Sequence, residues 1–252
     1  MQKDWINGNV EISVSGIPVQ LGFTVPAKPV KLSRMLPVFQ KMSDAFNDLG
    51  QKSLEAEGRR ISCKAGCGAC CRQLVPISEA EAHDLRSVVE NLPEPRQQEI
   101  RRRFDDAIQK LNGISFFKRL EKSAKGTERD YADAVSNYFS QQIACPFLED
   151  ESCSIHESRP IACREYLVTS PAEHCSSATG EKIENVEYSF KIKDALISIG
   201  RNNLKAELPF VPLIRLLEWT ENQEDDSPEH EGKDWMRLFF TQLVELGRQP
   251  AP

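Results

Sequence analysis

Apolar and polar positions follow two different rhythms along this chain. In the segment 10–25, apolar residues alternate with polar ones in two runs separated by Ser15-Gly16, which predicts a β-hairpin. From residue 35 the spacing changes to that of one helix face. A helix is therefore predicted over 35–56, with Pro37 in its first turn. Its apolar face consists of Met35, Phe39, Met42, Phe46 and Leu49.

Three further helices are predicted before residue 143. The first opens with a capping box formed by Ser78 and Glu81, and Pro93 ends it. The other two cover about 95–111 and 128–142. Their apolar stripes are Leu85, Val89 and Leu92, then Ile100, Phe104, Ile108 and Leu111, then Tyr131, Val135, Tyr138 and Phe139.

The C-terminal part has weaker signals. Alternating apolar residues predict a short strand near 186–192, although the same residues could begin a helix that runs to residue 200. A helix is expected behind Pro212 and another over 233–247, with an exposed acidic loop at 222–234 between them. The predicted fold is mainly α with small β elements (the N-terminal hairpin and the short strand near 186–192) and an irregular cysteine-rich metal-binding core.

The pattern also suggests a division of the chain. We expect an N-terminal hairpin and helix over 1–58 and a cysteine-cluster domain over 59–176. A helical insertion at 78–142 separates the two cysteine groups of that domain. The segment 177–252 is expected to be helical and to pack on the same core.

Composition and charge narrow the functional classes. The chain has 252 residues, of which 40% are hydrophobic, so it can bury a core without disulfide staples. Its net charge of -6 disfavours a nucleic-acid partner. The basic run 101–103 is flanked by Glu99, Asp105 and Asp106, which favours an ordinary solvated helix face. No secretory signal or spanning segment is recognised, so we expect a cytoplasmic protein with no membrane partner.

The eight cysteines are the main chemical signal. In a reducing compartment structural disulfides are rare, so this number favours metal ligands over four bridges. Disulfides would fit an exported protein. A buried small hydrophobe would explain one lone cysteine, but not four within nine residues.

The first cysteine group is Cys63, Cys67, Cys70 and Cys71. Glycines on both sides of Cys67 allow the backbone to wrap closely around a centre. Cys67-x-x-Cys70 is a clip typical of zinc and iron–sulfur sites. Because adjacent side chains point in different directions, Cys70 and Cys71 are expected to play unequal parts.

The second group is Cys145, Cys153, Cys163 and Cys175. Its longer spacings are weak by themselves, but the clip in the first group needs ligands from elsewhere in the chain. Cations beside the cysteines would offset the negative charge of several thiolates and lower thiol pKa values, or they are ordinary surface charges. These cations are Lys64, Arg72, Arg159 and Arg164.

Two histidines also lie near the cysteines. His156 and His174 could each bind a metal through a ring nitrogen. With eight cysteines available, we expect neither of them to be needed.

These motifs, in this order, resemble the YkgJ-type cysteine-cluster family (CxxCxxCC), a zinc- or iron-chelating group related to flagellin lysine N-methylases. The resemblance covers about 60–176 and rests on the CxxxCxxCC run, CPFL, CSIH, RPxxCR and a last cysteine. His156 stands where the family more often carries tyrosine. The matching positions are Cys63, Cys67, Cys70, Cys71, Cys145, Cys153, Arg159, Pro160, Cys163, Arg164 and Cys175.

The resemblance implies a metal centre, either zinc or an iron–sulfur cluster. Thiolate ligands suit both metals, and the CxxxCxxC spacing slightly favours a 4Fe–4S cluster. All eight cysteines are candidate ligands, which is four more than a single four-ligand centre needs. The expected role is structural or sensing.

Enzymatic roles are the alternatives. One is S-adenosylmethionine-dependent methylation of a protein lysine, with a protein substrate as partner. The spacing of Cys63, Cys67 and Cys70 matches radical S-adenosylmethionine enzymes, but no alternating βα framework follows it. Zinc-dependent hydrolysis would need a carboxylate base such as Glu157 or Glu165, which only proximity singles out.

Overall fold

The fold is mainly α with small β elements, as the hydrophobic pattern predicts. The computed structural model describes residues 4–14, 17–176, 182–188, 190–201 and 206–247. Its helices are α1 (Leu36–Ala56), α2 (Glu79–Glu90), α3 (Glu94–Gly113), α4 (Phe116–Ser123), α5 (Glu128–Ser140), α6 (Ile161–Glu165), α7 (Ile192–Ile199), α8 (Leu216–Asn222) and α9 (Gly232–Gly247).

The strands form antiparallel pairs. The long pair joins β1 (Trp5–Val14) to β2 (Ile17–Pro26) in a ten-residue register, which confirms the predicted hairpin. Its predicted turn, Ser15-Gly16, lies outside the described residues. The short pairs are β3 (Pro29–Val30) with β8 (His230–Glu231), β4 (Pro76–Ile77) with β7 (Val211–Pro212), and β5 (Leu148–Glu149) with β6 (Ser152–Cys153).

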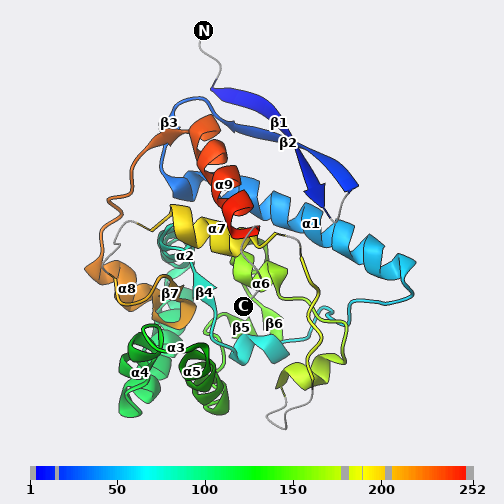
Figure 1. The fold of residues 1–252 in the computed structure, drawn as a ribbon. Helices are drawn as coiled ribbons and strands as arrows, with labels where there is room; N and C mark the ends of the chain where they lie inside the picture. The colour runs from blue at the N-terminus through cyan, green and yellow to red at the C-terminus, as the bar shows by residue number, and fades with distance from the viewer. Residues whose placement is uncertain (1–3, 15–16, 177–181, 189, 202–205, 248–252) are drawn as a thin grey trace.

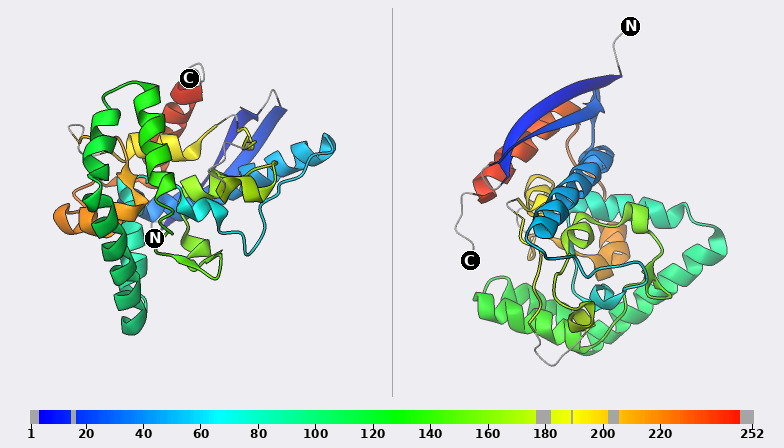
Figure 2. Two further views of the ribbon diagram at one scale, coloured as in Figure 1. Left: turned by 90° about the horizontal axis from the view of Figure 1, so that it is seen from below. Right: turned by 90° about the vertical axis from the view of Figure 1, so that its right-hand side faces the viewer.

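Three hydrophobic clusters hold the elements together. The first lies under the β1–β2 ribbon and joins α1, α7 and α9. The second joins α2, α3 and α8 with Phe147 and Ile155 from the second cysteine segment. The third lies between α3, α4 and α5. The ribbon and α9 lie at one end of the molecule and α3, α4 and α5 at the other (Figure 1 and Figure 2).

Several helix boundaries follow from local chemistry. The predicted capping box is present at α2, where Ser78 accepts the backbone N–H of Glu81 at 3.2 Å and the Glu81 carboxylate accepts that of Ser78 at 2.9 Å. A second capping box, formed by Thr127 and Asp130, opens α5. Helix α4 was not predicted; its apolar residues, Phe116, Phe117 and Leu120, span too few residues to show a period.

The predicted strand near 186–192 is wrong. Within the described residues this region has a single bridge, between Val168 and Asn185, and helix α7 begins at Ile192. The Glu165 carboxylate accepts the backbone N–H groups of Ile192 at 2.7 Å and Lys193 at 3.4 Å. A carboxylate from a distant segment thus caps the helix, and the alternative of a helix running to residue 200 describes the region better.

No helix in the described part of the chain combines the length and the apolar character that a membrane span requires.

Candidate metal centre

The first cysteine group lies in an irregular loop that ends in a 3-10 helix, Ala69–Arg72. Gly66 has φ of 78°, in the left-handed region where glycine carries little strain. The loop is closed by its own backbone, since the N–H of Cys67 donates to the carbonyl of Lys64 at 3.1 Å and that of Cys71 to Gly68 at 3.0 Å. The glycines therefore serve the tight backbone path that their spacing predicts.

The second group is spread over four local structures. Cys145 follows α5, Cys153 ends strand β6, Cys163 lies in the short helix α6, and Cys175 lies in a 3-10 helix, Ala172–Ser176. Strands β5 and β6 are joined by the predicted polar turn, whose two central residues have φ of 46° and 55°. Positive φ at both central positions is the geometry of a tight hairpin turn.

The fold brings the two groups together. The backbone N–H of Cys145 donates to the carbonyl of Cys71 at 2.7 Å, and Ser62 donates to Val168 at 2.9 Å. The thiols also act on one another electrostatically. Cys145 and Cys163 raise the pKa of Cys71, and Cys63 and Cys67 raise that of Cys175. Because such effects fade with distance, thiols from both groups share one region.

The eight thiols are free and do not form a preset coordination shell. In the part of the chain that the structure describes, no three cysteine, histidine or carboxylate side chains stand close enough together to hold a metal ion. The donors are thus gathered in one region without being arranged as a ligand set. The predicted ligand set stays a prediction.

Burial and hydrogen bonding set different pKa values for the thiols. Desolvation raises the pKa of Cys145 to about 12 and that of Cys163 well above its ordinary value. Cys70 differs, because a hydrogen bond from the Cys71 thiol favours its thiolate and lowers its pKa to about 7. The same contact keeps Cys71 protonated and raises its pKa. The adjacent pair is therefore electrostatically asymmetric.

Arg159 is the cation most directly placed among the thiols. Its charge favours the thiolate forms of Cys63, Cys70 and Cys153, although burial raises the pKa of Cys63 and Cys153. Its Nε atom is buried and has no hydrogen-bond partner in the described chain. A buried guanidinium N–H is costly without an acceptor, and thiolates would supply both the acceptor and the countercharge. This orphaned donor fits a negatively charged thiolate centre.

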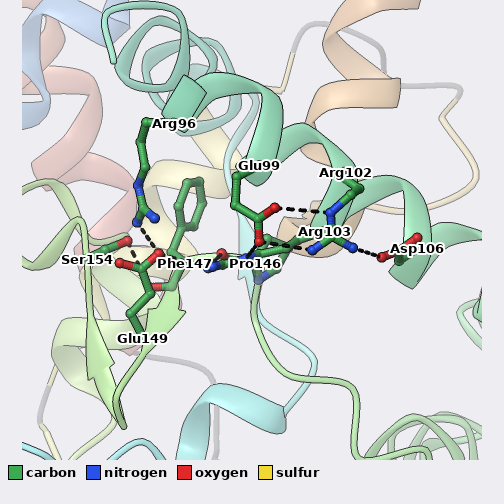
Figure 3. Close-up of polar contacts among 9 residues, drawn as sticks. All are labelled: Arg96, Glu99, Arg102, Arg103, Asp106, Pro146, Phe147, Glu149 and Ser154. Carbon is green, nitrogen blue, oxygen red and sulfur yellow. Dashed lines mark hydrogen bonds and ion pairs between the residues drawn. The ribbon is translucent and has the colours of Figure 1, made fainter. Parts of the chain in front are cut away.

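The hairpin that carries Cys153 is clamped from α3 (Figure 3). The Glu149 carboxylate accepts from Arg96 and Arg103, with Arg103 at 2.8 Å. Arg103 also donates to the carbonyl of Pro146 at 3.2 Å. Below these contacts the Phe147 ring packs edge-on against Phe104, with 5.5 Å between centroids. Within the basic run, Arg102 stays exposed beside acidic neighbours on its own helix, as the predicted solvated face requires, whereas Arg103 is engaged by the hairpin.

Helix α6, which carries Cys163, is held at both ends. At its start the buried Glu81 carboxylate accepts the backbone N–H of Ile161 at 2.8 Å. Near its end Arg164 donates to both carboxylate oxygens of Asp44 on α1 at 2.9 Å. The Arg164 side chain also donates to the carbonyls of Glu157 and Arg159. Glu81 and Asp44 are positioning residues that sequence reasoning missed, although the capping box had marked Glu81 for a local role.

The first group docks on the second through Arg72 and Gly68. Arg72 forms a two-point ion pair with Glu151, at 2.7 and 3.1 Å, and donates to the Gly68 carbonyl at 2.9 Å. A Cβ at Gly68 would lie 2.6 Å from both Glu151 Oε2 and Leu148 Cδ1. Arg72 and Arg164 therefore hold the loops in place, whereas Lys64 is exposed.

The other predicted candidates lie at the edge of the cluster. His156 is exposed, and nearby Arg159 lowers its pKa. His174 Nδ1 lies 3.3 Å from the carbonyl oxygen of Lys182. Glu165 caps α7, and Glu157 is exposed. Glu165 therefore serves the scaffold, as the cap of a helix distant in sequence.

Comparison with known proteins yields one match. Residues 62–188, half of the chain, match the family model CxxCxxCC, described as "Putative zinc- or iron-chelating domain". No curated protein and no solved structure matches the chain. The matched region begins one residue before Cys63 and covers all eight cysteines.

Proposed function

Because the chain belongs to the CxxCxxCC family, we propose that thiolates from 63–71 and 145–175 hold an iron–sulfur cluster or a zinc ion in a structural or sensing role. The observation that carries the proposal is the meeting of both cysteine groups around a buried guanidinium nitrogen that has no acceptor of its own. Thiolate sulfurs are soft, anionic ligands, so such a site favours binding of a soft metal cation.

Charge balance supports this assignment. Four thiolates around a divalent ion leave about two net negative charges, which are costly to bury without compensation. Arg159 supplies one fixed positive charge beside Cys63, Cys70 and Cys153. This charge offsets part of the negative charge that the thiolates bring to the site.

The spacing of Cys63, Cys67 and Cys70 favours a 4Fe–4S cluster over zinc. Bound metal of either kind would supply cross-links between the two cysteine groups. The protein side chains do the positioning: Glu81 and Arg164 hold α6, and Arg72 holds the first loop against the hairpin. Methylation of a protein lysine stays a prediction from the resemblance alone.

The decisive experiment is anaerobic purification of the full chain, followed by metal analysis and an optical spectrum. The proposal expects stoichiometric iron and sulfide with the visible absorption of a cluster. A colourless protein with stoichiometric zinc would reject the cluster and keep the metal site. Reduced protein that holds neither metal after reconstitution would overturn the proposal.

Variants test the ligands separately from folding. We expect Cys67→Ser and Cys163→Ser each to abolish metal loading, while His174→Ala retains it. Arg159→Gln removes the charge and leaves a shorter side chain that can still donate a hydrogen bond, so metal affinity is expected to fall by roughly tenfold. Circular dichroism must show wild-type helix content in each variant. Full metal loading by both cysteine variants would contradict the assignment.

A further inference from the structure

A second feature, separate from the cysteines, is a slot beside the N-terminal ribbon. Its volume is about 1000 Å³, and its walls come from β2, from α1 with the turn before it, and from the start of α2. None of the eight cysteines lines it. This volume is typical of a site for a ligand or a short peptide.

The slot runs along the free edge of β2. Four consecutive residues of this strand, 21–24, line it, although successive side chains of a strand point to opposite faces. Lining by consecutive residues therefore indicates the edge of the strand. On its other side β2 pairs with β1, and the described chain provides no strand for the open edge. Figure 1 shows β2 on the α1 side of the ribbon.

This edge lacks the usual protection against pairing. Between Pro18 and Pro26 the strand contains no charged residue and no proline. Proteins commonly blunt such edges with lysine, proline, a bulge or a covering element. In the described chain no strand pairs with this edge, on the side of β2 away from β1. The backbone donors and acceptors of the edge are therefore available to an added strand.

The wall opposite the edge carries cations. Arg34 and Lys41 line the slot, both are exposed, and neither has an ion pair within the described chain. Arg34 lies in the 3-10 helix Leu32–Met35, which leads into α1, and Lys41 lies in the second turn of α1. Two carboxylates also line it: Asp225 is paired with Lys31 at 3.4 Å, and Asp84 faces Arg34. Lys41 therefore offers the least compensated charge.

We infer that this slot binds an extended acidic peptide segment, which adds a strand to β2 and directs its carboxylates to Arg34 and Lys41. Main-chain hydrogen bonds would supply the affinity and the cations the preference for acidic side chains. Trp5, 57% exposed at the slot, offers an aromatic surface to the same segment. A second copy of this chain fits less well. Its own ribbon and α1 would have to enter a slot that is already bounded by α1 of the first copy.

The test measures binding of defined peptides to the full-length protein by fluorescence anisotropy. The probe is an acetylated and amidated octapeptide of alternating valine and glutamate, labelled with fluorescein. We expect saturable binding that weakens at least tenfold when every second backbone nitrogen is methylated, because methylation removes the ladder donors and keeps the side chains. Lysine in place of glutamate is expected to weaken binding by at least tenfold. Absence of saturable binding, or equal binding of all three peptides, would overturn the inference.

Protein variants locate the site. Arg34→Glu with Lys41→Glu is expected to reduce affinity at least tenfold, while Lys52→Glu, exposed on the same helix outside the slot, leaves it unchanged. Circular dichroism checks that both variants are folded. Equal affinity for both variants would place binding elsewhere. Concentration-dependent dimerisation that the double variant abolishes would identify a second copy as the occupant and overturn the peptide assignment.

Discussion

The two cysteine groups are supported in different ways. The segment 145–165 is anchored in the hydrophobic cores, since Phe147 and Ile161 are almost completely buried. It is also clamped from three helices through Glu149, Glu81 and Arg164. In contrast, no residue of the 3-10 helix that carries Cys70 and Cys71 is buried. The loop 62–74 depends on backbone turns and on contacts with the second segment.

This difference suggests a division of labour. The second segment is a scaffold built by the fold, and the first is a less buried clip that docks on it. A region with few buried apolar contacts opens at low free energy, so a bound metal has most to stabilise in the clip. Four changes test this comparison.

Metal removal is expected to have the largest effect. Chelation removes the cross-links of the proposed centre, so amide protection in 62–74 is expected to fall by roughly a hundredfold or more. Protection in 161–165 is expected to change much less, because Glu81 and Arg164 still hold α6. Hydrogen exchange with mass spectrometry, with and without chelator, measures both. Equal loss in the two segments would contradict the division.

The substitution Arg164→Ala tests how much Arg164 contributes to the stability of the segment 145–165. The Arg164 residue is 6% exposed, and the substitution leaves the carbonyls of Glu157 and Arg159 without their donor. Because Arg164 is a buried charged group that donates several hydrogen bonds, its loss is expected to lower the free energy of unfolding by about 4 kcal/mol. Urea denaturation measures it. Arg102→Ala, at an exposed ion pair, is the control and is expected to leave the free energy of unfolding nearly unchanged.

Glu165→Gln tests whether the contact between the Glu165 side chain and the start of α7 makes the stability of the protein depend on pH. Burial raises the pKa of Glu165 to about 7, above its ordinary value of 4.5. The folded protein therefore holds this proton more tightly than the unfolded chain does. The stabilisation is complete below pH 4.5 and is lost as the pH rises through about 7, a change of about 3 kcal/mol.

The glutamine variant is expected to lack this change. Urea denaturation at pH 5 and pH 8, with reductant and chelator, gives the difference between wild type and variant at each pH. The exposed Glu157→Gln variant serves as the control for nonspecific charge effects. A difference that is the same at both pH values would show that Glu165 does not titrate as stated.

The substitution Gly68→Ala tests the contact between the loop 62–74 and the β5–β6 hairpin. The added methyl group would lie 3.1 Å from the Glu151 Cα and closer still to the side chains of Leu148 and Glu151. Relief of this overlap must separate the loop from the hairpin, at a cost of about 2 kcal/mol. Gly113→Ala is the matched control, because a Cβ at the end of α3 meets nothing within 4 Å. Equal stability of the two variants would show that the contact at Gly68 yields easily.

Prediction from the sequence worked where the signal is local. The alternation in 10–25 and the helical period from Met35 to Leu49 are properties of neighbouring residues, and both elements are present. The capping box at Ser78 is likewise local. The region near 186–192 failed because a strand and a helix start look alike over so few residues. The Glu165 carboxylate, distant in sequence, favours the helix.

The sequence by itself determined the helical class of the fold and the membership of a metal-chelating family, because periodicity and cysteine spacing are written in short stretches of chain. Only the tertiary structure decided that Arg159 lies among the thiols, that Glu81 caps the helix of Cys163, and that the β2 edge borders a slot with exposed cations. These contacts join residues far apart in the chain. Their electrostatic and hydrogen-bond energies depend on distances in space, which no local pattern encodes.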